Sequence, residues 1–97
     1  MAPVDAEYAL AQLEALVAIE SPAPAESPLV DYVERELNAL GMATQRVPLE
    51  HGRDNLLASV GGGSPIVCLN THADTVPRSG ESQAQPRRDG DRLWGLG

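Results

Sequence analysis

Apolar residues recur at helical spacing near the start of the chain. Between residues 8 and 20 they fall three or four positions apart, which predicts an amphipathic helix with Asp5 as its N-cap. A Ser-Pro-Ala-Pro sequence at residues 21–24 is expected to end it, because a residue that precedes proline is disfavoured in helical conformation. The apolar positions that form this pattern are Leu10, Leu13, Leu16 and Val17.

A second helix is predicted from Ser27 to Leu40. Ser27 is a suitable N-cap, Pro28 suits the first helical position, and Gly41 follows where a helix commonly stops. Its apolar stripe consists of Val30, Val33, Leu37 and Leu40. Both helices are interpreted as packing elements of a folded core.

Strand patterns follow the second helix. Residues 43–47 are expected to form an edge strand that Pro48 ends, and residues 55–60 a second strand. Residues 65–71 are predicted as a third strand, with residues 61–64 as a Gly-rich turn that makes a hairpin with the second. Because residues 65–69 are continuously apolar, this third strand is expected to be covered on both faces.

The last part of the chain is more polar. Residues 79–91 are expected to form an exposed loop that ends in the Asp89-Gly90-Asp91 turn, followed by a short strand at residues 92–94. Two helices followed by a hairpin and short strands predict an α/β fold with a mixed central sheet. At 97 residues the chain is long enough for one small domain.

Charge and composition narrow the classes of function. The net charge of −7 argues against nucleic acid or an anionic membrane as a partner, because both require a basic face. The single cysteine, Cys68, excludes an internal disulfide. No signal peptide or membrane span is predicted, so a cytoplasmic protein is expected.

The strongest chemical signal is His72 followed by Asp74 at the end of the third predicted strand. A carboxylate two residues away can accept one ring N–H of an imidazole whose other nitrogen binds a metal. The alternative is a surface loop histidine with an incidental aspartate, but the end of an α/β strand is where such sites are built. Cys68 is interpreted as a small buried hydrophobic residue, because about 13 Å of extended chain separates it from His72. His51 is expected to lie in an exposed turn.

Several motifs occur together in a characteristic order and resemble one family of enzymes. The chain resembles the N-terminal part of the dinuclear zinc metallohydrolases that include acetylornithine deacetylase, succinyl-diaminopimelate desuccinylase, aminoacylases and carboxypeptidases. The sequence around His72 is most similar to that of the acetylornithine deacetylases. The motifs are Leu16-Val17-Ala18-Ile19-Glu20-Ser21-Pro22, Leu40-Gly41-Met42, Asn55-Leu56-Leu57-Ala58, Leu69-Asn70-Thr71-His72-Ala73-Asp74-Thr75-Val76-Pro77 and Asp89-Gly90-Asp91-Arg92-Leu93-Trp94-Gly95-Leu96-Gly97.

This resemblance implies a metal-dependent amidohydrolase with two zinc ions, for which cobalt can substitute, and a homodimer formed through a separate domain. By the same likeness, His72 is a metal ligand and Asp74 is the catalytic-site residue that orients its imidazole. The remaining ligands and the general-base Glu would lie beyond Gly97, so residues 1–97 would be the N-terminal portion of the catalytic domain and inactive alone. The implied substrate is a small N-acyl amino acid or peptide, and the implied role is arginine biosynthesis.

Two alternatives stay open at this stage. Within the family, the substrate could instead be that of succinyl-diaminopimelate desuccinylase or of a dipeptidase or carboxypeptidase. Outside enzymes, the chain could be an inactive truncated product or an interaction module.

Overall fold

The computed structural model describes residues 3–77 and 85–95. Its first helix, α1, spans Ala6–Ala18 and has Asp5 as its N-cap, as predicted. The Asp5 carboxylate accepts a hydrogen bond of 3.0 Å from the backbone N–H of Tyr8, which satisfies one of the free donors at the start of the helix. The helix ends where Ile19 adopts an extended conformation, ahead of the Pro-rich stretch.

Helix α2 spans Ser27–Ala39, and its beginning differs from the prediction. Ser27 is not the N-cap, because Glu26 already has helical φ and ψ and takes that position without a side-chain capping bond. The predicted stop is confirmed. Gly41 has a φ of 87°, its N–H bonds the carbonyl of Asn38, and the N–H of Met42 reaches back to Leu37, which is the Schellman arrangement.

The first two predicted strands form a hairpin with each other. Strand β1 covers Ala43–Pro48 and strand β2 covers Asp54–Ser59, paired antiparallel from Ala43 opposite Ser59 to Pro48 opposite Asp54. A short 3₁₀ turn, η1 at Glu50–Gly52, connects them. His51 lies in this turn with a φ of 61° and an exposed side chain, as expected of an exposed turn histidine.

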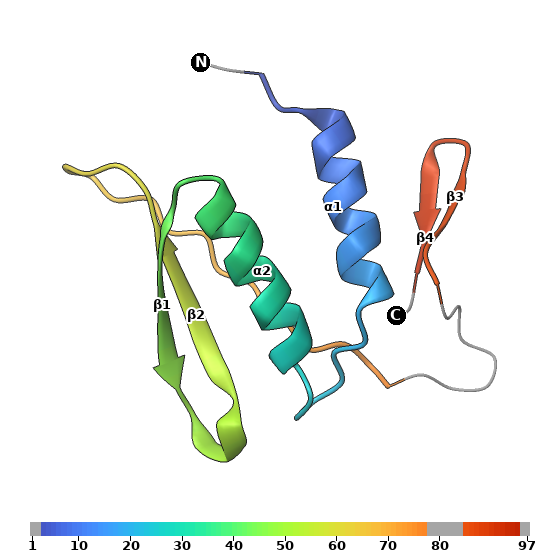
Figure 1. Ribbon diagram of the computed structural model, residues 1–97. Helices are drawn as coiled ribbons and strands as arrows, with labels where there is room; N and C mark the ends of the chain where they lie inside the picture. The colour runs from blue at the N-terminus through green and yellow to red at the C-terminus, as the bar shows by residue number, and fades with distance from the viewer. Residues whose placement is uncertain (1–2, 78–84, 96–97) are drawn as a thin grey trace.

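The hairpin predicted between residues 55–60 and 65–71 is therefore wrong, since β2 pairs with β1 instead. Figure 1 shows residues 60–77 as a trace without a strand arrow. Most of the apolar side chains there are exposed, including Leu69 at 94%. A strand needs neighbouring backbone to pair with, and the described residues supply none beside residues 65–71. Cys68 is exposed as well, so its interpretation as a buried residue is also wrong.

A second small hairpin follows, formed by β3 at Arg87–Asp89 and β4 at Arg92–Trp94. It confirms the short strand at 92–94 and the turn at Gly90, which has a φ of 59°. The predicted loop at 79–91 is wrong in its last part, because residues 87–89 pair antiparallel with residues 92–94 across a two-residue turn. Residues 78–84 of that loop lie outside the described residues.

The elements are arranged side by side, with α2 between α1 and the β1–β2 hairpin and with β3–β4 next to α1 (Figure 1). The two helices are linked by the hydroxyl of Tyr32, which donates to Gln12 at 2.7 Å. Arg88 of β3 forms an ion pair with Glu14 of α1. Val30 is the one apolar side chain that is buried among the described residues, at 8% exposure.

Arg46 connects α2 to both strands of the β1–β2 hairpin. Its guanidinium lies 2.7 Å from Asp31, 2.9 Å from Glu34 and 3.3 Å from Asp54. The hydrogen bond from Arg46 lowers the pKa of Glu34 below its ordinary value of 4.5, in spite of an opposing effect of burial. The same bonds, with Glu34 first and Asp31 next, raise the pKa of Arg46. Ion pairs therefore hold together a layer that buries little apolar surface.

The order of elements confirms the predicted α/β class, with two helices followed by a hairpin and short strands. Within residues 3–77 and 85–95, no helix is long and apolar enough to cross a membrane.

Candidate functional site

The structure brings the two predicted site residues, His72 and Asp74, into contact. The Nδ1 atom of His72 lies 3.1 Å from Oδ1 of Asp74 and 2.9 Å from the backbone carbonyl oxygen of the same residue. Both neighbours are acceptors, so the imidazole satisfies them only by carrying its proton on Nδ1. In the neutral ring this leaves Nε2 as the nitrogen with a free lone pair.

Both side chains are accessible to a ligand. The side chain of His72 is 82% exposed and that of Asp74 is 50% exposed. An imidazole held at one nitrogen by a carboxylate and open at the other is the arrangement that metal-binding histidines commonly show. The arrangement is local, because the two residues are separated by one alanine.

The His72 segment is fixed to the rest of the molecule by the linker between the helices. The hydroxyl of Ser21 donates to the carbonyl of Ala73 at 2.9 Å, and the carbonyl of Ser21 accepts from the N–H of Thr75 at 2.9 Å. Pro22 and Thr75 form an isolated parallel β-bridge. The sequence did not predict this contact, because Ala73 lies 52 positions after Ser21 and no local sequence pattern indicates that the two meet.

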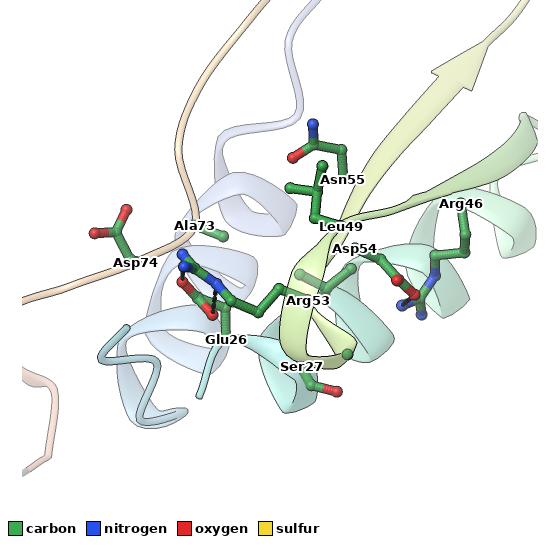
Figure 2. Close-up of a pocket in the computed structure, with 11 residues that line it drawn as sticks. Glu26, Ser27, Arg46, Leu49, Arg53, Asp54, Asn55, Ala73 and Asp74 are labelled. Carbon is green, nitrogen blue, oxygen red and sulfur yellow. Dashed lines mark hydrogen bonds and ion pairs between the residues drawn. The ribbon is translucent and has the colours of Figure 1, made fainter. Parts of the chain in front are cut away.

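A shallow pocket lies beside the segment, with Ala73 and Asp74 at its rim (Figure 2). Its central feature is a two-fold hydrogen-bonded pair between Arg53 and Glu26, with distances of 3.1 Å and 2.5 Å. Glu26 is 7% exposed, and a carboxylate so buried needs a cation beside it. The pair joins the start of α2 to the turn before β2, so it supports the pocket as a structural element. It was not predicted from the sequence.

The donor set for a metal is incomplete in this part of the chain. Among residues 3–77 and 85–95, no group of three or more His, Cys, Asp or Glu side chains is placed to hold an ion. A zinc site normally takes at least three protein ligands. His72 fits such a site as one ligand with its orienting carboxylate, and other ligands would have to come from elsewhere.

Comparison with known proteins gives relatives of one kind. The chain is 37% identical over 84 residues to a succinyl-diaminopimelate desuccinylase of Rhodopseudomonas palustris, in a match that covers 82% of this chain and 21% of the relative. It is 40% identical over 76 residues to an acetylornithine deacetylase of Pasteurella multocida, covering 71% and 20%. A desuccinylase of Rhodospirillum rubrum is 38% identical over 81 residues, covering 79% and 20%.

The chain thus spans about a fifth of the length of the curated relatives it matches. No family profile matches it, and no solved structure matches it. The relatives are desuccinylases and deacetylases, which are enzymes that hydrolyse amide bonds. The chain therefore resembles the N-terminal part of the hydrolase family that contains succinyl-diaminopimelate desuccinylase and acetylornithine deacetylase, as its motifs predicted.

Proposed function

We propose that residues 1–97 form the N-terminal portion of the catalytic domain of a zinc-dependent enzyme that hydrolyses the amide bond of N-acyl amino acids. The observation that carries the proposal is the contact of His72 Nδ1 with Asp74, which leaves Nε2 as the ring's free nitrogen. The similarity to deacetylases and desuccinylases supports the reaction class.

In this proposal each residue of the segment has a separate task. His72 would hold a zinc ion through Nε2, and Asp74 would keep the proton on Nδ1 and fix the plane of the ring. The bound metal would lower the pKa of a water molecule and polarise the amide carbonyl of the substrate. The remaining ligands and the general base are assigned to parts of the enzyme outside this chain, so the chain alone is expected to be inactive.

The substrate is proposed to be a small amino acid that carries an acetyl or succinyl group. The sequence around His72 favours acetylornithine, as in arginine biosynthesis, whereas the match to desuccinylases favours succinyl-diaminopimelate as the second candidate. A cytoplasmic location and a homodimer of the complete enzyme complete the proposal. Neither nucleic acid nor a membrane is proposed as a partner.

The test uses the complete protein that contains this sequence, assayed with N-acetylornithine and with N-succinyl-diaminopimelate. We expect release of acetate or succinate that a chelator abolishes and zinc restores. His72→Ala should remove one zinc and nearly all turnover. His51→Ala, at the exposed turn, should keep the full zinc content and normal turnover. Full zinc content and full turnover in His72→Ala would contradict the assignment.

A further inference from the structure

Ser21 is the most buried side chain in the described residues, with an exposure of 0%. It lies in the linker between α1 and α2, where a serine would ordinarily be solvent-exposed. Its hydroxyl and its carbonyl are both used, one toward Ala73 and the other toward Thr75, each at 2.9 Å. A buried polar residue with two partners on one segment indicates a specific role in holding that segment.

The two partners of Ser21 flank Asp74 on either side. Fixing the carbonyl before Asp74 and the N–H after it restricts the backbone on which the Asp74 carboxylate is carried. The apolar part of the same segment is not packed against the described residues, with Ile66 at 86% exposure and Leu69 at 94%. The anchor is therefore placed at the residue that contacts His72 rather than spread along the segment.

We propose that Ser21 is a positioning residue that holds Asp74 against the imidazole of His72 and thereby fixes the ring proton on Nδ1. The functional value of this anchor rests on the proposed function, since a fixed tautomer matters only if Nε2 of His72 binds a metal. The geometric claim concerns this chain alone and can be tested without a metal.

The energetic argument follows from burial. Replacing Ser21 by Ala removes the donor and leaves the Ala73 carbonyl without that partner in a partly covered position. The backbone of residues 73–75 then gains freedom, and the contact between His72 and Asp74 competes with other arrangements of an exposed loop. The Thr75 bond to the Ser21 carbonyl can persist, so we expect loosening of the segment rather than its release.

The first experiment measures the tautomer of His72 from the two ring ¹⁵N chemical shifts of the 97-residue chain, at a pH where the imidazole is neutral. His51 is the internal reference, because its side chain is exposed and its Nε2, not its Nδ1, is the ring nitrogen near a carboxylate among the described residues, 4.0 Å from Glu50. We expect His72 to show the Nδ1–H form in the unmodified chain. In Ser21→Ala its shifts should move toward those of His51, and in Ser21→Thr, which retains the hydroxyl, they should return.

Ser59→Ala is the matched control, since Ser59 is an exposed serine at the end of β2. It should leave the shifts of both histidines unchanged. An unchanged His72 tautomer in a folded Ser21→Ala chain would overturn the proposal.

A second measurement on the unmodified chain decides the case in which Ser21→Ala fails to fold. The Thr75 N–H, bonded to Ser21, should exchange with solvent about tenfold or more slowly than the N–H of Leu69, after correction for sequence. Equal exchange rates would show that the anchor does not form. These measurements involve no zinc, so a negative result would not contradict the proposed hydrolase activity. Conversely, a complete enzyme that needs no metal would not contradict the hydrogen bonds of Ser21 to residues 73 and 75.

Discussion

Residues 27–59 and residues 60–77 are neighbouring stretches of the chain, yet they are stabilised in opposite ways. The first stretch holds α2, β1 and β2, with a regular hairpin, a capped helix end and three ion pairs of Arg46. The second contains the continuously apolar residues 65–69 and the candidate site. Its backbone forms no strand, and it is hydrogen-bonded to the helix linker at Ser21.

The difference shows what apolar composition alone can and cannot do. A hairpin satisfies its own backbone through contacts close in sequence, so β1 and β2 form on local information. An apolar run such as residues 65–69 becomes a strand only when other backbone lies beside it, and the described residues provide none. The candidate site thus lies in the less supported stretch, which is bonded to the buried Ser21.

The largest expected contrast compares a side chain of each stretch. Val30→Ala should lower the opening free energy of the β1–β2 amides by roughly 2 kcal/mol, because it removes buried methyl groups and leaves a cavity. Leu69→Ala should change it by less than about 0.5 kcal/mol, because that side chain is exposed. Hydrogen exchange of the β1 and β2 amides measures both. A Leu69→Ala effect as large as that of Val30→Ala would show that residues 65–69 are packed.

A smaller effect is expected at the ion pairs that join α2 to the hairpin. Arg46→Met leaves three carboxylates near one another without their cation and should lower the same opening free energy by about 1–2 kcal/mol. Arg35→Met, in helix α2, is the control, since the Arg35 guanidinium lies 6.0 Å from the Tyr32 ring and is expected to contribute less. Equal losses in the two variants would exclude a special role for the Arg46 cluster.

The smallest expected effect is the pH dependence that Glu34 gives to the first stretch. Its pKa is lowered in the folded chain, so the unfolded chain binds more protons as the pH falls. The stabilisation is therefore present above about 4.5 and is lost as the pH drops through the lower, folded pKa. Acid titration of the opening free energy should show this loss, and Glu34→Gln should reduce it.

Glu50→Gln, at an exposed carboxylate in the turn, is the control for that titration. It should leave the acid-induced loss unchanged. A Glu34→Gln chain with the same acid dependence as the unmodified chain would contradict the assignment to Glu34.

Much of the fold follows from local sequence, and the exceptions are long-range. Asp5 and Gly41 mark helix ends by rules that act over a few residues, and both were predicted correctly. Ser27 was wrongly predicted as the N-cap because it is already the first helical residue, and Glu26, whose carboxylate is bonded to the distant Arg53, takes the cap position. The predicted pairing of residues 65–71 and the predicted burial of Cys68 were wrong for one reason. Both require other parts of the chain to pack against this segment, and the described residues provide none.

The candidate site divides in the same way. The contact of His72 with Asp74 could be anticipated, because residues two apart can reach one another along the chain. The contribution of Ser21 could not, since it depends on how the helix linker meets a segment 52 residues further on. The roles of His72 and Asp74 toward a metal stay predictions of the proposed function.

The most direct test of the account is the zinc affinity of the complete protein after substitution of Asp74, measured by competition with a chelator. Asp74→Asn should keep the fold and lower the affinity, because a neutral amide oxygen replaces the carboxylate beside Nδ1. Asp74→Ala should lower the zinc affinity more than Asp74→Asn does, to roughly 10–100-fold below that of the unmodified protein. The loss is expected near the lower end, since the backbone carbonyl of residue 74 still accepts from Nδ1 at 2.9 Å. Full zinc occupancy and normal turnover in Asp74→Ala would show that Asp74 is only a loop residue, and the assignment of His72 and Asp74 to a metal site would fail.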